Sequence, residues 1–201
     1  MATKNVKTAP YVGFERVAIA SLATDTKEEY TFGDVIEIVD GAVSMSFNIT
    51  ASENAFYSSN KKTSSDFTYT PTGSIAYAGD SFEIDKLLFG KKELNGAVIE
   101  NLGAAPNVSV IGLMNTGDGW VIRHITKATA AKDDVAVTTK GESVTFTNPS
   151  ATLSCMASTF FNTYTRDFYS AHPALEGKTA TEVFDALLAD PMTAYNEAVG
   201  V

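Results

Sequence analysis

The chain has 201 residues, 44% hydrophobic and 19% charged, so it can bury a core within one domain and is charge-poor for a globular protein. Asp and Glu total 24 against 15 Lys and Arg, which disfavours sequence-independent binding to nucleic-acid phosphates. The single cysteine, Cys155, excludes an intramolecular disulfide and a multi-cysteine zinc site, and we expect it to be a small buried side chain.

Residues 1–12 predict an N-terminal arm, because they contain Lys4 and Lys7, no acidic residue and few apolar side chains. The alternative for an isolated monomer is a disordered terminus. No apolar segment of the length of a signal peptide is present here, so we expect cytoplasmic synthesis.

The first half of the chain is rich in strand signals. Apolar and β-branched residues recur at 17–19 and 35–39, and residues 43–50 alternate strictly between apolar and polar. Alternation with a period of two indicates a strand with one buried face, here carrying Val43, Met45, Phe47 and Ile49.

Residues 51–65 are mostly polar and surround the pair Phe56-Tyr57, which predicts a long loop. The following segments, 67–70 and 75–77, flank Pro71-Thr72-Gly73, so we expect a tight hairpin turn at these three residues.

A short helix is predicted at 82–89, where Ile84, Leu87 and Leu88 share one face, with Asp80 or Ser81 before it and Gly90 after it. Further strands are expected at 108–114, 120–127, 135–138, 144–147 and 153–157. The pattern predicts a mainly β fold: an antiparallel β-sandwich or barrel with one flanking α-helix, over residues 13–158.

Residues 159–201 are expected to form a C-terminal extension with short helices. The aromatic segment 160–169 has two interpretations, a last core strand or a segment that lies on a neighbouring subunit. Residues 181–189 have helical spacing, with Thr179 or Thr181 as N-cap and Asp190-Pro191 as the end, and a second short helix is expected at 191–198.

The sequence offers little catalytic chemistry. His124 lies in an expected strand and His172 precedes a proline, and neither has a neighbouring carboxylate and nucleophile. Asp133-Asp134 and the 115–119 segment are better explained as turns than as calcium ligands. A pair of carboxylates brought together across strands, as in glycosidases, would leave no local motif. We expect a non-enzymatic protein without a cofactor or metal.

Several segments together resemble one family. Residues 12–17 with 35–41, the helix 80–90, the turn and aromatic-led strand 115–120, and the Thr-rich stretch 135–153 are similar to corresponding parts of the major tail tube proteins of long-tailed, siphophage-type bacteriophages. The resemblance covers roughly residues 12–157. The helical end of the chain departs from the compact form of that family.

The resemblance implies a structural virion protein, made in the host cytoplasm, whose hexameric rings stack into the tail tube through which DNA is ejected. Its partners would be other copies of itself and the tape measure, tail terminator and distal tail proteins, with DNA passing through without specific binding and no membrane involved. The acids expected to line the channel are Glu15, Asp34, Glu37 and Asp40. Contacts between subunits or rings are expected at Lys4, Lys7, Tyr11, Phe56, Tyr57, Lys61, Lys62, Phe160, Phe161, Tyr164, Phe168 and Tyr169.

An alternative function is a carbohydrate- or receptor-binding β-sandwich module. It would require Trp120 and several tyrosines to form an exposed, flat stacking surface.

Overall fold

The computed structural model describes residues 8–39, 41–58, 61–100, 103–135 and 148–192, with only the backbone described at 54, 56–58 and 61–65. Within these residues the fold is mainly β, with antiparallel sheets, two α-helices and no closed barrel. The mainly β fold with a flanking helix, expected from the sequence, is thereby confirmed.

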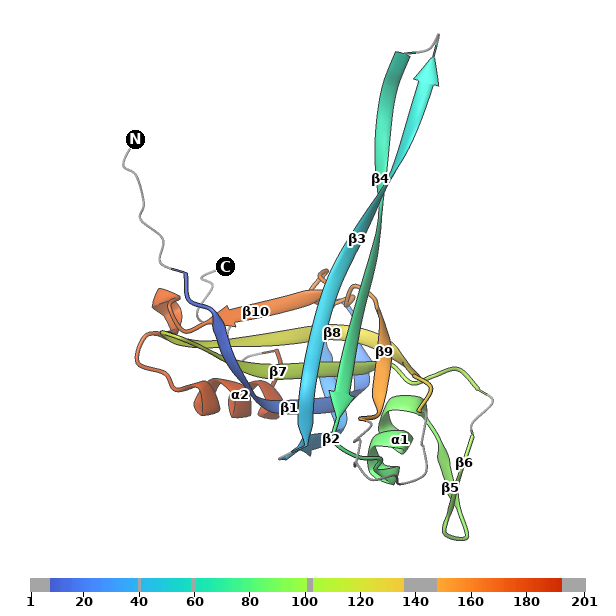
Figure 1. The fold of residues 1–201 in the computed structure, drawn as a ribbon, viewed down its shortest axis with the longest axis vertical. Coiled ribbons are helices and arrows are strands. Elements are labelled where there is room, and N and C mark those ends of the chain that lie inside the picture. The colour runs from blue at the N-terminus through green and yellow to red at the C-terminus, as the bar shows by residue number, and fades with distance from the viewer. Residues whose placement is uncertain (1–7, 40, 59–60, 101–102, 136–147, 193–201) are drawn as a thin grey trace, which may run out of the picture.

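One large sheet dominates the described part of the chain (Figure 1). Its strands lie in the order β2-β1-β7-β8-β9-β4-β3, with β10 paired to β8 beside this path, and every pairing is antiparallel. The bounds are β1 Tyr11–Asp25, β2 Tyr30–Ile38, β3 Ala42–Ser58, β4 Lys61–Tyr77, β7 Val108–Thr116, β8 Gly119–Lys132, β9 Ser150–Cys155 and β10 Thr165–Tyr169.

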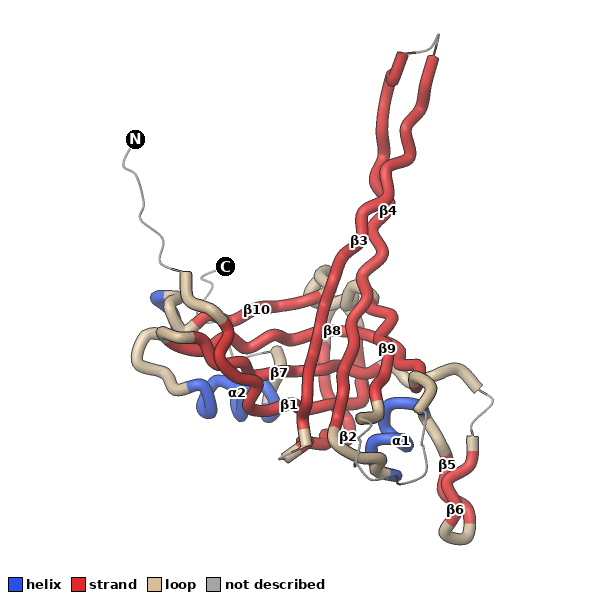
Figure 2. The backbone as a smooth tube through the Cα atoms, in the orientation of Figure 1, coloured by secondary structure: helices blue, strands red, loops and turns tan. Residues whose placement is uncertain are grey.

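The sheet divides along β8, because the first half of this long strand pairs with β10 and its last residues pair with β9. As a result β9, β4 and β3 turn away from β1, β7 and β10, and the β3–β4 hairpin crosses in front of them (Figures 1 and 2). The two parts of the sheet enclose a core between them.

Alternation along β1 supplies side chains to both faces of its sheet. Val17 and Ile19 point into the core beneath β3 and β4, whereas Ala18 points to the opposite face. The helix α1, Phe82–Phe89, closes the first core with Ile84, Leu87 and Leu88 at its buried face.

The helix α2, Ala180–Ala189, covers the second face. Val183, Phe184 and Leu187 are fully buried against Ile111, Leu113 and Ile122 of β7 and β8. α2 begins with a capping box: the Thr179 hydroxyl accepts from the backbone N–H of Glu182, whose carboxylate accepts from that of Thr179. Both expected helices, 82–89 and 181–189, are therefore present. A short 3₁₀ turn, η1 Pro173–Leu175, precedes α2.

Two predictions about β3 and β4 are wrong. Residues 51–65 do not form a loop within the described range, because both strands continue through it as one long hairpin, paired from Ala42–Tyr77 to Ser58–Lys61. Pro71-Thr72-Gly73 is not a turn either, and Pro71 pairs with Ile49 in mid-strand. It is tolerated because β9 pairs with β4 only from Thr72 onward, so the missing N–H faces no partner strand there.

The expected boundary after residue 158 does not separate two units. β10 pairs with β8 from Thr165–Ile125 to Tyr169–Val121, so the sheet includes the aromatic segment, as the core-strand interpretation proposed. At the other end, β1 already begins at Tyr11, inside the expected arm.

Some predictions fall outside the described residues, namely the strands at 135–138 and 144–147, apart from Val135, and most of the helix at 191–198. A small separate hairpin, β5 Lys92–Leu94 and β6 Ala97–Ile99, extends from the end of α1. No helix in the described ranges is both long and apolar enough to span a membrane.

Candidate functional site

The most prominent surface feature is the distal part of the β3–β4 hairpin, residues 49–58 and 61–71, which we call the ribbon. It is two-stranded, because β9 stops pairing with β4 at Thr72. Ten residues of strand correspond to roughly 33 Å, and Figure 2 shows the ribbon standing away from the rest of the molecule. A hairpin of two strands is only marginally stable alone in water, so the ribbon is expected to need further contacts.

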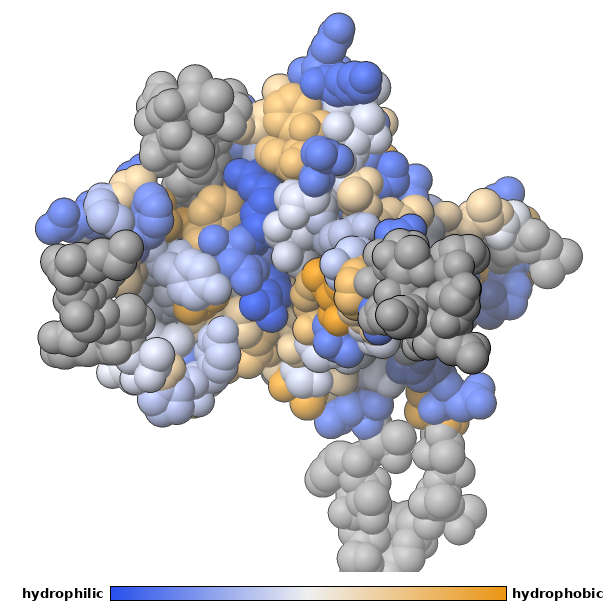
Figure 3. All heavy atoms as spheres, turned by 90° about the horizontal axis from the view of Figure 1, so that it is seen from above, coloured by the Kyte–Doolittle hydropathy of each residue, from blue (hydrophilic) through white to orange (hydrophobic). Residues whose placement is uncertain are grey.

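One side of the ribbon carries large apolar side chains that the described chain leaves exposed, with Glu53 among them opposite Phe67. Ile49, Phe67 and Tyr69 are 43%, 48% and 56% exposed, and the two rings stack with their centroids 6.5 Å apart. They continue the strand face that carries Met45 and Phe47 into the core. The alternation thus runs past the point where the core ends, and Figure 3, which looks down on the hairpin side, shows hydrophobic residues at the surface there.

The other side of the same sheet is rich in hydroxyl groups. Register and alternation place one face of β3, β4, β9 and the end of β8 toward solvent, and two acidic residues also lie on it: Asp66, which pairs with Asn54, and Asp133, which accepts from Ser150 and Thr152. The Ser46 and Ser74 hydroxyls are 2.8 Å apart. We call this the hydroxyl face; its uncharged residues are Ser44, Ser46, Asn48, Thr50, Ser52, Thr68, Thr70, Thr72, Ser74, Ala76, Thr129, Ala131, Ser150, Thr152 and Ser154.

Two strands end the sheet, β2 and β3, and within the described residues neither has a strand on its outer side. Unpaired edges of this kind are templates for pairing with another chain. Because the sheet does not close on itself, partners for both edges would have to come from outside the described part of the chain.

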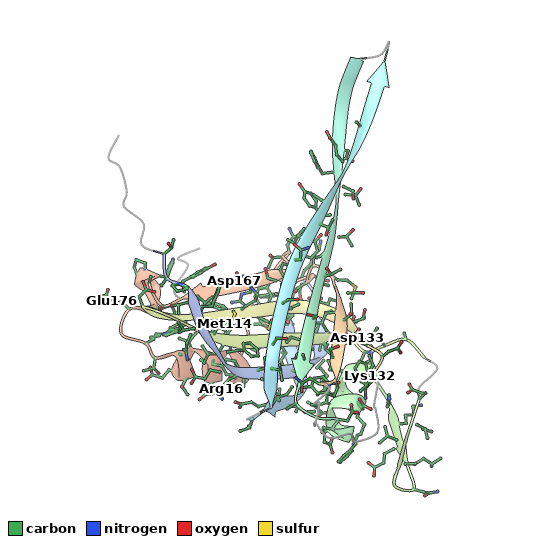
Figure 4. The ribbon with its side chains drawn as sticks, viewed as in Figure 1. Arg16, Met114, Lys132, Asp133, Asp167 and Glu176 are labelled. Atoms are coloured by element: carbon green, nitrogen blue, oxygen red, sulfur yellow. The ribbon has the colours of Figure 1, made fainter. Side chains whose placement is uncertain are left out.

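The expected channel acid Glu37 is part of an ion cluster. The Arg16 guanidinium contacts the Glu37 carboxylate at 2.6 and 2.9 Å and Asp185 of α2 at 2.9 Å, and it lies 4.4 Å from the ring centroid of Phe184. Hydrogen bonding to Arg16 lowers the pKa of Glu37. The cluster fastens α2 to β1 and β2, with Arg16, labelled in Figure 4, at its centre. Glu37 is therefore paired with Arg16, although two carboxylates on one guanidinium leave the cluster with one net negative charge.

The other expected channel acids lie in different strands. Glu15 accepts a hydrogen bond from the Asn115 amide at 2.7 Å, at the start of β1. Asp34 is exposed in β2, and Asp40 lies outside the described residues. Their assignment to a channel lining stays a prediction.

The expected contact residues of the arm and of the hairpin are placed only in part. Tyr11 is 59% exposed at the start of β1, and Lys4 and Lys7 lie outside the described residues. The backbone of four further residues lies at the end of the ribbon, although their side chains are not described: Phe56, Tyr57, Lys61 and Lys62.

The aromatic residues after 159 are mostly engaged within the chain. The Phe161 ring lies 4.8 Å from that of Tyr30, with the Arg166 guanidinium 4.0 Å from its centroid, and Phe160 packs against Phe161. Half-buried Phe168 packs on the α2 side of the sheet, and Tyr164 is also half-buried. Of this set Tyr169 is the exposed one.

A buried polar cluster that the sequence did not predict lies below these rings. His124, Ser109 and Tyr30 are fully buried, with Ser109 Oγ 2.8 Å from His124 Nε2 and donating to the Ile125 carbonyl at 3.1 Å. The Tyr30 hydroxyl donates to the Thr126 carbonyl at 2.5 Å. His124 Nδ1 has no hydrogen-bond partner among the described residues, and burial lowers the pKa of His124 well below its usual value. The imidazole is therefore neutral and enclosed, a structural group without access for a substrate.

The alternative function, a binding module with a flat aromatic surface, loses its principal residue. Trp120 is only 9% exposed and packs in the core beneath α2.

Asp133 accepts hydrogen bonds from the hydroxyls of Ser150 at 2.6 Å and Thr152 at 2.8 Å. No cluster of three metal-ligating side chains occurs in the described ranges.

No protein-family model matches the chain, and no curated protein matches it.

Proposed function

We propose that this chain is a self-assembling structural subunit of a hollow tube, of the kind that forms the tail tube of long-tailed bacteriophages. The observation that carries the proposal is the ribbon, whose Ile49, Phe67 and Tyr69 remain about half exposed beyond the core. A soluble monomer gains nothing from a two-stranded projection with an apolar side, whereas a neighbouring subunit would cover it.

The open sheet supports the same proposal. A ring forms when one surface of each copy contacts a different surface of the next copy and the rotation closes. The ribbon supplies one projecting surface, and the body with its edge strands supplies receiving surfaces. In a closed assembly of several copies these edges are covered rather than left exposed to non-specific aggregation.

The charge distribution fits a conduit for nucleic acid. The net charge is −9, and Asp66 and Asp133 on the hydroxyl face are acidic. Neither feature supplies the Lys and Arg contacts that hold phosphates, so DNA would pass without being retained. The sequence resemblance over residues 12–157 adds the expectation of stacked hexameric rings.

The test is negative-stain electron microscopy of the purified protein over a range of concentrations, combined with two matched double variants. Phe67→Ser with Tyr69→Ser removes the apolar side of the ribbon, and Asn48→Ser with Thr70→Ser changes its hydroxyl face. We expect rings or tubes from the native chain and from the hydroxyl-face variant, and folded but unassembled protein from the first variant. A native chain that stays monomeric at all concentrations and salt conditions would refute the proposal.

A further inference from the structure

A groove runs along the outer edge of β2, and its occupant is not among the described residues. It encloses about 540 Å³ between β2 and the end of α2, and we call it the β2 groove. Phe32, Val35 and Leu188 supply its apolar surface, and Glu29 and Asp190 are its acidic residues. Its shape is that of a channel beside an unpaired strand rather than of an enclosed pocket.

Among the strands that the structure describes, none pairs with the backbone at this edge. β2 is the terminal strand of the sheet, and the Tyr30 N–H points away from β1 to the thioether sulfur of Met192, at 2.9 Å. A thioether is a weak acceptor, so a backbone carbonyl in its place would make a stronger hydrogen bond. An extended segment that added to β2 would supply such carbonyls and bury its side chains in the groove.

The net charges of the two chain termini differ, and this difference indicates which of them fits the β2 groove better. Residues 1–10 contain Lys4 and Lys7 and no acidic residue, whereas residues 193–201 contain Glu197 and no basic residue. Opposite charge favours a basic segment beside Glu29 and Asp190, and like charge disfavours an acidic one. The N-terminal arm is therefore the better electrostatic match.

The arm of the same copy is too short to fill the groove. The Gly117 N–H donates to the Pro10 carbonyl at 3.1 Å, which holds Pro10 at the turn between β7 and β8. The nearer end of the groove, at Val35, pairs with Ala20, which lies nine residues, or roughly 30 Å of strand, along the bent strand β1 from Tyr11 (Figure 1). The nine residues before Pro10 span at most about 31 Å when fully extended, so most of the arm would be used in reaching the groove and little would remain to lie along it.

We propose that the N-terminal arm, residues 1–10, of one copy adds as a strand to the β2 edge of a second copy, with its lysines beside Glu29 and Asp190. The inference rests on the proposed self-assembly, since a second copy must supply the arm. It names the surface that receives the arm, and it makes α2 part of the subunit interface.

The test uses full-length chains with single introduced cysteines, since Cys155 is buried. A Val6→Cys chain is mixed with a Thr31→Cys chain, whose cysteine lines the groove, and oxidised; disulfide-linked dimers are followed on non-reducing gels. The matched control replaces Thr31→Cys by Thr181→Cys, at the exposed opposite end of α2. We expect the groove pair to cross-link at least tenfold faster than the control pair, and Lys4→Glu with Lys7→Glu to remove most of this advantage.

Equal rates for the two pairs would overturn the inference. An intramolecular disulfide in a Val6→Cys/Thr31→Cys chain would also overturn it, because the arm would then lie in the groove of its own copy. So would an intramolecular disulfide in a Val199→Cys/Thr31→Cys chain, because the C-terminal tail of the same copy would then occupy the groove. Electron microscopy of the same chains separates the two proposals. Tubes without the selective cross-link would reject the inference alone, and protein without rings or cross-links would reject both.

Discussion

Asp25, at the end of β1, gives the sharpest prediction about stability. Its carboxylate is 6% exposed and accepts from Lys127 Nζ at 2.9 Å, Ser158 Oγ at 2.8 Å, and the backbone N–H groups of Thr159 at 2.8 Å and Phe160 at 3.2 Å. These contacts fasten the segment before β10 to the sheet. We predict that Asp25→Asn, which keeps the shape but removes the charge, destabilises the fold.

The magnitude follows from the pKa of Asp25. Burial by itself would raise it, but the hydrogen bonds from Lys127, Thr159, Ser158 and Phe160 outweigh burial and lower the pKa from 3.8 to about 2. A shift of this size corresponds to about 2.5 kcal/mol of stability at neutral pH. Because the folded-state pKa is the lower one, this stability is present above about pH 4 and is lost as the pH falls toward 2.

The assay is urea unfolding of the unassembled chain at pH 7 and at steps between pH 5 and 2. We expect Asp25→Asn to cost roughly 2–3 kcal/mol at pH 7, or about 5–10 °C in Tm, and to flatten the loss of stability between pH 4 and 2. The control is Asp118→Asn, which changes an exposed carboxylate in the turn between β7 and β8. A native-like stability of Asp25→Asn at pH 7, or an unchanged acid slope, would refute the reasoning.

Three further predictions concern single side chains. His124 is buried and neutral with a lowered pKa, so on acidification the imidazole is protonated in the unfolded chain before it is protonated in the folded one. The free energy of unfolding should therefore fall as the pH drops below about 6.5, and denaturant titrations of His124→Gln should lack this pH dependence. Thr179→Ala should cost about 1 kcal/mol by removing the N-cap of α2, and Thr181→Ala should cost less in the same unfolding assay. Gly73→Ala should cost roughly 1–3 kcal/mol, because the added Cβ would lie 2.9 Å from a backbone carbonyl oxygen of β3. In the control, Gly79→Ala, the added Cβ would meet no atom within 4 Å, and comparable Tm values for the two variants would contradict the prediction.

Local sequence signals predicted the elements that bury one face in the core. The spacing of Ile84, Leu87 and Leu88 follows from burial of one helix face. In the alternating segment 43–50 the prediction was right only for Met45 and Phe47, because Val43 and Ile49 are 44% and 43% exposed. The same reasoning failed for residues 51–65, since the ribbon extends past the core and its strands carry no buried apolar pattern. Pro71 and Gly73 then looked like a turn, although β3 and β4 stay paired as far as Ser58 and Lys61.

The contacts of charged side chains and the groove were harder to predict, because they depend on residues distant in sequence. The cluster of Arg16, Glu37 and Asp185 joins residues from both ends of the chain, and no local pattern of charges predicts it. The groove beside β2 likewise requires the end of α2 to be placed at Glu29 and Val35. The sequence indicated an arm with Lys4 and Lys7, but not the surface that would receive it.

The hydroxyl face has a consequence for how the proposed assembly should respond to ions. Coulombic contacts weaken as the Debye length shortens, from about 10 Å at 0.1 M to 3 Å at 1 M ionic strength. The Ser, Thr and Asn side chains of this face exchange hydrogen bonds with water and carry no net charge for counterions to screen, so only its acidic residues, such as Asp66 and Asp133, respond to salt. Contacts made through the hydroxyl groups should therefore change little between dilute and concentrated salt, and the ionic sensitivity of the proposed assembly should lie mainly in the charged arm and groove.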